Sequence, residues 1–260
     1  HFRENEKMIL TLPVGLQNSS NYNKIHNICA LEYRDTIPML ENKMERLFHS
    51  GYGIIQEEFL PYFDSIIDYL VENNIKIFSF DLGPSAEKVE LEDYYYISKS
   101  EPLTTNKLLE TIKYRISYIR NKYHGGIALE NLNFFPTTAY AHVCETDFIY
   151  DAIIENEVYM VLDIAHAIIS AKNMGVDKYK YLSLFPLSRV KIIHLSSPGI
   201  KDGKWRDLHR IPTNEEYDVL AFIEKLLTQD PYLVIESSDN LATLQKTYES
   251  VNIDYNLNKI

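Results

Sequence analysis

The stretch VYMVLDIAHA, residues 158–167, decides how the chain folds. An apolar run rich in valine ends at the acidic Asp163, and His166 follows three residues later. A short run of this composition predicts a buried strand, and the apolar pattern from near Ile168 predicts a helix after it. Side chains at the carboxyl ends of parallel strands meet at one edge of a sheet or barrel. Asp163 and His166 are therefore candidates for a site at such an edge.

The same alternation of a short apolar run and a longer amphipathic segment recurs along the chain. The helical patterns include residues 57–74, 105–123, 145–157 and 213–229. Thr213 or Asn214 is the expected cap of the last helix, with Glu216 in its first turn. The candidate strands begin at Met8, Ile28, Arg46, Ile75, Gly126, Val158, Val190 and Tyr232.

Eight strands with intervening helices predict an α/β fold, a closed (β/α)₈ TIM barrel that forms a single domain over residues 1–260. The polar stretch 83–105 is expected to be a loop rather than a domain boundary. An open, doubly wound sheet is the alternative architecture. It has less support because no GxGxxG motif follows the first strand.

Composition limits the classes of function. The 37 acidic side chains outnumber the 26 basic ones, which gives a formal charge of -11 and disfavours a nucleic-acid backbone as partner. No apolar run approaches the roughly 18 residues of a membrane span, and the opening residues lack a secretory pattern. A cytoplasmic protein without a membrane partner is expected. Cys29 and Cys144 are far apart in sequence and predict reduced, structural thiols.

Metal-binding residue types stand at or after nearly every strand end from the third strand onward. They are His49, Asp81, Glu130, Asp163, His166, His194, Asp207, His209 and Glu236, with Asp207 and His209 in the expected loop after the seventh strand. Crowded carboxylates repel one another and would take up protons unless cations lie between them. We therefore expect two or three metal ions that share bridging carboxylates. Imidazole and carboxylate ligands without thiolate suit iron, manganese or zinc.

The motifs around these residues resemble a known family. They are PVGLQ, LEYRDTI, FHSGYGI, LENLNFF, LDIAHAIISAKNMG, VKIIHLSS, WRDLHRIPTNEEYDVL and LVIESSD, in that order from about Leu12 to Leu244. In order and spacing they are similar to the multinuclear non-haem iron-dependent oxidative enzymes, which include the iron enzyme of methanobactin biosynthesis. That family belongs to the xylose-isomerase-like barrel superfamily, in which endonuclease IV has a similar array of nine ligands.

The resemblance implies a barrel with two or three irons that uses O₂ to oxidise residues, often cysteines, of a ribosomally made precursor peptide. It also implies a small partner protein that helps to present this peptide. All the residues above except Asp81 match ligand positions of the family. Asp81, His209 and Glu236 are in addition the candidate catalytic residues. Trp205, Tyr140 and Phe134 stand near the expected rim. Each of these aromatic side chains could either pack in the core or contact the peptide.

Two residues depart from the family's usual pattern. Asp81, in SFDL, stands where the family usually has histidine, and His166 stands where it often has asparagine. The segment HLSSPG also lacks a further histidine that is common in the family. A carboxylate in place of an imidazole adds negative charge and favours a higher oxidation state of the bound ion.

Three other functions remain open. A sugar isomerase or epimerase would need one Mn²⁺ on Glu130, Asp163, His194 and Glu236, with the glutamates moving a proton beside a carbonyl. An endonuclease IV-like phosphodiesterase would use a zinc cluster, although the acidic charge speaks against DNA binding. A catalytically inactive barrel that acts as a binding subunit would bind no metal.

Overall fold

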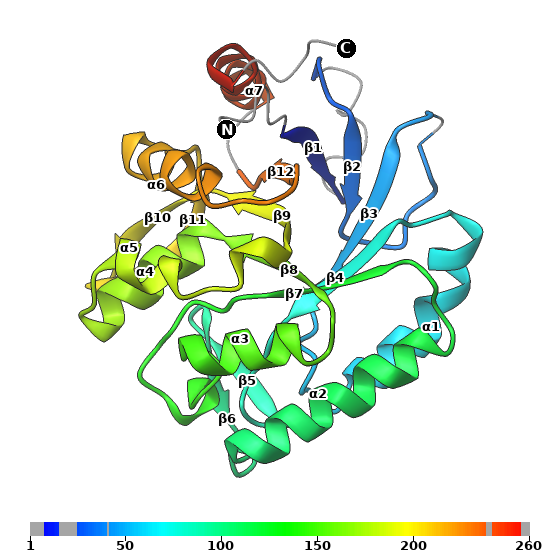
Figure 1. Ribbon diagram of the computed structural model, residues 1–260, viewed down its shortest axis with the longest axis vertical. Helices are drawn as coiled ribbons and strands as arrows, with labels where there is room; N and C mark the ends of the chain where they lie inside the picture. Colours follow the sequence, from blue (N-terminus) through cyan, green and yellow to red (C-terminus); the bar gives the residue numbers. More distant parts are fainter. Residues whose placement is uncertain (1–7, 16–24, 41, 238–240, 256–260) are drawn as a thin grey trace.

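The computed structural model describes residues 8–15, 25–40, 42–237 and 241–255. Within this part of the chain, eight parallel strands close into a barrel in the order β1-β12-β9-β8-β7-β4-β3-β2 (Figure 1). The barrel strands are β1 (Ile9–Val14), β2 (Ala30–Tyr33), β3 (Glu45–Ser50), β4 (Ile77–Asp81), β7 (Gly126–Glu130), β8 (Tyr159–Asp163), β9 (Val190–Leu195) and β12 (Tyr232–Ile235). This confirms the predicted (β/α)₈ barrel. Leu16 and Gln17 of the first motif and Ser238 and Asp239 of the last lie outside the described residues.

Helices lie around the outside of the strands (Figure 1). They are α1 (Phe59–Glu72), α2 (Thr105–Arg120), α3 (Thr146–Ile154), α4 (Ile164–Met174), α5 (Lys178–Ser183), α6 (Asn214–Glu224) and α7 (Leu241–Tyr255). Thr213 caps α6 in a capping box with Glu216, as predicted. The expected start of α4 near Ile168 is wrong. The helix begins directly after Asp163, because the carboxylate of this residue accepts the backbone N–H of His166 at 2.6 Å and caps the helix.

The inside of the barrel holds a layer of mostly small and branched apolar side chains. They come from seven strands and include Ala30, Leu47, Ile77, Ala128, Val161, Ile192 and Val234. Side chains along a strand alternate between the two faces, so the residue two positions further on also points inward. The residues two positions after these seven apolar ones are Glu32, His49, Ser79, Glu130, Asp163, His194 and Glu236. A polar layer therefore lies directly above the apolar one, at the carboxyl ends of the strands.

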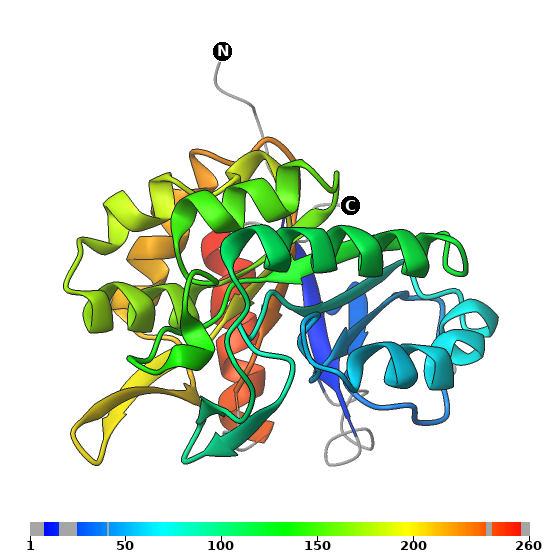
Figure 2. The ribbon, with the colours of Figure 1, turned by 90° about the horizontal axis from the view of Figure 1, so that it is seen from below.

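Two hairpins extend the barrel at this end. The first, β5 (Val89–Glu92) and β6 (Tyr95–Ser98), lies within residues 83–105, so the expected loop is wrong in part. The second, β10 (Ser197–Lys201) and β11 (Lys204–Arg210), follows β9. Figure 2 shows them side by side below the barrel. Buried Arg206 of β11 connects them, because its Nη1 donates to the backbone oxygen of Asp93 at 2.6 Å.

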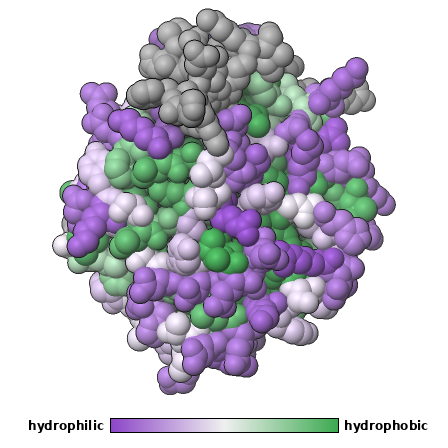
Figure 3. Space-filling view, viewed as in Figure 1, coloured by the Kyte–Doolittle hydropathy of each residue, from purple (hydrophilic) through white to green (hydrophobic). Residues whose placement is uncertain are grey.

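A second apolar core lies between the strands and the surrounding helices, where residues such as Phe63, Phe78 and Ile149 are fully buried. On the face that Figure 3 shows, hydrophobic residues form separate patches within a mostly hydrophilic surface. None of the helices in the described ranges is long and apolar enough to cross a membrane.

Candidate metal centre

His194 of β9 lies at the centre of the polar layer and is fully buried. Its Nδ1 atom is 3.0 Å from Oε1 of Glu130 and 3.3 Å from Oε1 of Glu236, on β7 and just after β12. Its Nε2 atom is 3.1 Å from Oε2 of Glu32 on β2. Because a histidine offers one nitrogen to a metal and donates from the other, Nδ1 is the candidate ligand atom and Glu32 the acceptor that orients the ring.

His49 of β3 joins the same group of side chains. Its Nε2 atom is 3.1 Å from Oε2 of Glu130, and its Nδ1 atom is 3.0 Å from the hydroxyl of Ser79 on β4. The register of the sheet places Asp81 opposite Glu130, so the last residue of β4 reaches the same group. His49 and Asp81, both predicted from the sequence, thus meet at one carboxylate.

Asp163 and His166 meet at the junction of β8 and α4. Nδ1 of His166 is 2.9 Å from the backbone oxygen of Asn131, which can only accept, so this nitrogen carries the proton. The other nitrogen, Nε2, is then available as a ligand and lies 3.5 Å from Oδ2 of Asp207. His166 is therefore held by the fold in the tautomer that metal binding needs.

Asp207 and His209 lie on β11, so their predicted position in a loop is wrong. The hairpin returns them to the barrel end, where Nε2 of His209 is 3.0 Å from Asp207 Oδ2 and 3.5 Å from Glu236 Oε2. His209 has φ 45°, a left-handed conformation that histidine adopts more readily than most residues. Its backbone N–H donates to Oδ1 of Asp207 at 3.1 Å. This backbone conformation places the imidazole of His209 beside the other candidate ligands.

Two residues of the centre were missed by the sequence analysis. Glu32 is fully buried, and its Oε1 atom is 2.6 Å from Nη2 of Arg34, which also contacts Glu236. The signal for Glu32 was present, because it stands two residues after the inward-facing Ala30. Arg34 follows the same period, because it stands two residues after Glu32 and directly after the end of β2, but its contact with Glu236 joins segments that are distant in sequence.

The centre contains more buried carboxylates than its positively charged side chains can neutralise. Burial raises the pKa of Asp81 to about 7 and that of Asp163 to about 6, and the charge of Glu130 adds to both effects. Burial lowers the pKa of His49 to about 3, so this ring is neutral and able to bind a metal. Burial also opposes the charge of His194, but Glu32 and Glu130 outweigh it and raise its pKa to about 9.

The donor set fits more than one cation. Four groups of side chains have possible ligand atoms within 4.8 Å of one another: Glu32, His194 and Glu236; His49, Asp81 and Glu130; Glu130, Asp163 and His166; Asp207, His209 and Glu236. Glu32 belongs to the first group by distance, although its contact with Nε2 of His194 assigns it to orienting this ring. Glu130 and Glu236 each belong to two groups. In addition, Oδ2 of Asp163 is a buried oxygen without a hydrogen-bond donor among the described residues. Such an oxygen is costly unless a cation meets it, so the residues present fit a multinuclear metal centre.

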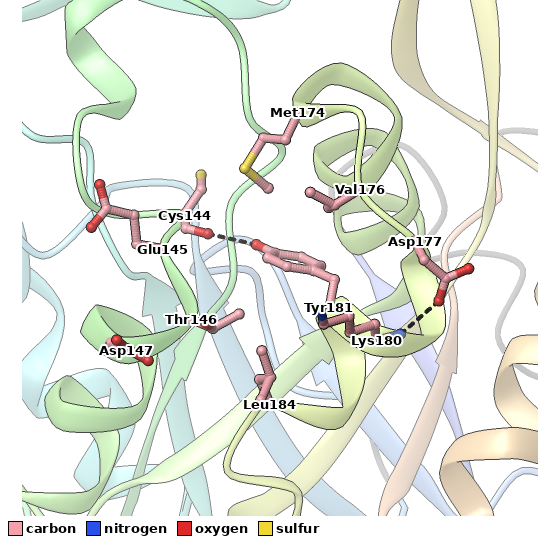
Figure 4. Close-up of a pocket in the computed structure, with 10 residues that line it drawn as sticks. All are labelled: Cys144, Glu145, Thr146, Asp147, Met174, Val176, Asp177, Lys180, Tyr181 and Leu184. Atoms are coloured by element: carbon pink, nitrogen blue, oxygen red, sulfur yellow. Dashed lines mark hydrogen bonds between the residues drawn. The ribbon is translucent and has the colours of Figure 1, made fainter.

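A separate cavity lies between the start of α3 and the end of α4 with α5 (Figure 4). Its volume is about 660 Å³, and it contains none of the candidate ligands. The hydroxyl of Tyr181 donates to the backbone oxygen of Cys144 across it at 2.7 Å. Burial raises the pKa of the Cys144 thiol, which makes it a poor nucleophile. Both cysteines are free, as predicted.

The closed barrel of eight parallel strands with surrounding helices is a TIM barrel, and solved structures have a similar fold. A xylose isomerase domain containing protein from Salmonella typhimurium has a TM-score of 0.64 at 13% identity, covering 95% of this chain and 97% of that one. The 3-keto-D-glucoside 4-epimerase YcjR from E. coli has a TM-score of 0.62 at 13% identity, covering 95% and 100%. At this level of identity, the likeness concerns the fold alone.

The chain belongs to the family described as RiPP precursor modification enzyme MbnB/TglH/ChrH, which matches residues 87–256. The match runs from β5 to α7 and includes seven of the nine predicted ligands, leaving His49 and Asp81 before it. A UPF0276 protein of Acaryochloris marina is 29% identical over 119 residues, 45% of this chain. The match spans 43% of that protein, so the chain aligns with less than half of its length.

Proposed function

We propose that the chain is an iron-dependent enzyme that oxidises a residue of a ribosomally synthesised precursor peptide, with O₂ as the oxidant. Membership of this family supports a precursor peptide as the class of substrate. Cysteine is the first candidate for the oxidised residue. A small partner protein that presents the peptide is part of the proposal.

The sharing of Glu130 and Glu236 between groups of candidate ligands supports a centre of two or three irons. A carboxylate has two oxygens and can bridge neighbouring cations, whereas a single ion would leave several of these groups without a role. Iron suits the mixed imidazole and carboxylate donors, and manganese and zinc are the alternatives. When bound, iron supplies the redox chemistry with O₂.

The residues of the chain divide the other tasks. His49, Asp81, Glu130, Asp163, His166, His194, Asp207, His209 and Glu236 are the proposed metal ligands. Glu32 orients His194, and Asn131 orients His166 through its backbone oxygen. His209 exposes half of its side chain and is the ligand best placed to meet the peptide. With Asp81 and Glu236 it forms the proposed catalytic set.

The test is to purify the protein without O₂, load it with ferrous iron, and count the metal ions per chain. O₂ and the peptide encoded beside the gene are then added, and the peptide mass is measured. We expect two or three irons and a loss of mass that corresponds to removal of hydrogen, or a gain that corresponds to added oxygen. Absence of bound iron, or an unchanged peptide, would contradict the proposal.

A matched pair of glutamate variants sharpens this test. Glu130→Gln removes the proposed bridging carboxylate and should lower the iron count and abolish oxidation. Glu45→Gln, at the other end of β3, changes the same residue type outside the centre and should leave both unchanged.

A second candidate is a sugar epimerase with a single metal on Glu130, Asp163, His194 and Glu236. The close approach of Glu130 and Glu236 to the same nitrogen of His194 supports it. It leaves His49, Asp207 and His209 without a task. One metal ion per chain together with activity on a ketose would favour it over peptide oxidation.

A further inference from the structure

A second cavity lies against the two hairpins, and we call it the hairpin cavity. Its volume is about 380 Å³, and Tyr95, Phe135, Pro136, Thr137, Lys204 and Trp205 are among its lining residues. None of the proposed metal ligands lines it. Its size is near the lower limit for small-molecule sites, which suits one large side chain better than a whole cofactor.

The walls of the hairpin cavity are aromatic. The rings of Tyr95 and Phe135 are stacked, with centroids 5.2 Å apart and an interplanar angle of 26°. On the other side, Nζ of Lys172 lies 3.6 Å from the centroid of the Trp205 ring and covers one of its faces. Flat apolar walls of this kind favour a planar ring, which gains both buried area and aromatic contact.

The rim of the hairpin cavity includes one cationic side chain, that of Lys204, in a chain whose formal charge is -11. Lys204 and Lys201 are exposed at the tip of the β10–β11 hairpin. Their Nζ atoms are 3.4 Å and 3.3 Å from the hydroxyls of Tyr95 and Tyr94, and within the described ranges neither lysine forms an ion pair with a carboxylate. A ligand with a carboxylate beside its ring would complement this rim.

The hairpin cavity shares strand β11 with the candidate metal centre. Trp205, which lines the cavity, and Asp207, a proposed ligand, are two residues apart on this strand, a rise of about 7 Å. An extended peptide advances about 3.3 Å per residue, so two or three residues span this distance.

We propose that the hairpin cavity binds an aromatic side chain of the precursor peptide that has an acidic neighbour and stands two or three positions from the oxidised residue. This inference rests on the proposed function for its substrate. Buried Arg206 holds the two hairpins together, so the cavity exists before the peptide arrives. Of the aromatic residues expected near the rim, Trp205 therefore contacts the peptide, whereas Tyr140 is buried in the core.

Trp205 is the single tryptophan of the chain, so its fluorescence reports on the hairpin cavity directly. The full chain is titrated, without O₂, with three synthetic peptides: acetyl-Asp-Phe-Asp-amide, acetyl-Asp-Ala-Asp-amide and acetyl-Lys-Phe-Lys-amide. We expect a saturable change with the first peptide. The alanine peptide should bind about tenfold more weakly or not at all, because it buries no ring. The lysine peptide should also bind more weakly.

Lys204→Glu reverses the charge at the rim and should weaken binding of the first peptide by about threefold or more, with circular dichroism to check folding. Lys113→Glu, on the exposed face of α2, makes the same change elsewhere and should have no effect. No saturable change with any peptide, equal binding of the alanine peptide, or equal binding by Lys204→Glu would overturn the inference. Because the titration involves no oxidation, its result is independent of the test of the proposed function.

Discussion

Replacing Glu32 by glutamine should weaken iron binding without removing a ligand. Glu32 is fully buried, and its two oxygens face Arg34 at 2.6 Å and His194 at 3.1 Å. Glutamine keeps the shape but removes the negative charge, so the hydrogen bond with metal-bound, neutral His194 becomes a neutral one, whereas Arg34 keeps its own charge. A hydrogen bond to a charged group contributes roughly 1.5–3 kcal/mol, against about 1 kcal/mol for a neutral one. His194 then loses about 0.5–2 kcal/mol of support, which corresponds to a loss in affinity of about two- to thirtyfold.

The measurement is a competition for ferrous iron against a chromophoric chelator under anaerobic conditions, for the unsubstituted protein, Glu32→Gln and Glu45→Gln. We expect weaker binding for Glu32→Gln with an unchanged number of ions, and no change for Glu45→Gln. A glutamine variant at position 32 that binds iron within about twofold of the unsubstituted protein would refute the orienting role of Glu32. A lower ion count would instead identify Glu32 as a ligand.

Three further predictions concern proton release, helix capping and thiol reactivity. Because the pKa of Asp163 is raised to about 6 without metal, metal binding near pH 6 should release more protons than near pH 8, as calorimetry in buffers of different ionisation enthalpy would detect. Thr213→Ala should lower the free energy of unfolding in urea by about 1 kcal/mol, whereas Asn214→Ala, one residue into α6, should cost less. Under native conditions an alkylating reagent should modify partly exposed Cys29 before buried Cys144, and equal rates would contradict the described burial.

The barrel itself was predictable because its strands are buried on both faces and therefore read as continuous apolar runs. The β5–β6 hairpin was not, because its strands are VELE and YYIS and none of their residues is buried. A hairpin at the surface leaves little hydrophobic pattern, and its stability depends on contacts such as Arg206 with Asp93 that join distant parts of the chain. Local pattern alone carries no information on such contacts.

The candidate site was predictable to the extent that it follows strand ends. Asp163, His194 and Glu130 come at or next to the last residue of an apolar run, where the barrel fold brings them together. Glu32 was overlooked because it stands before another apolar residue, Tyr33, and not at the end of its run. Applying the period of two residues from the inward-facing layer finds it, which is a rule that other barrels of this kind can use.

Asp163 has two tasks that share one side chain. Its Oδ1 atom caps α4, and its buried Oδ2 atom has no hydrogen-bond donor and faces the candidate metal centre. Metal binding at the centre and formation of the first turn of α4 are therefore thermodynamically linked. Each favours the other by the same free energy. Hydrogen exchange at the backbone amide of His166 consequently reports whether the metal is bound, and this exchange should slow when it is.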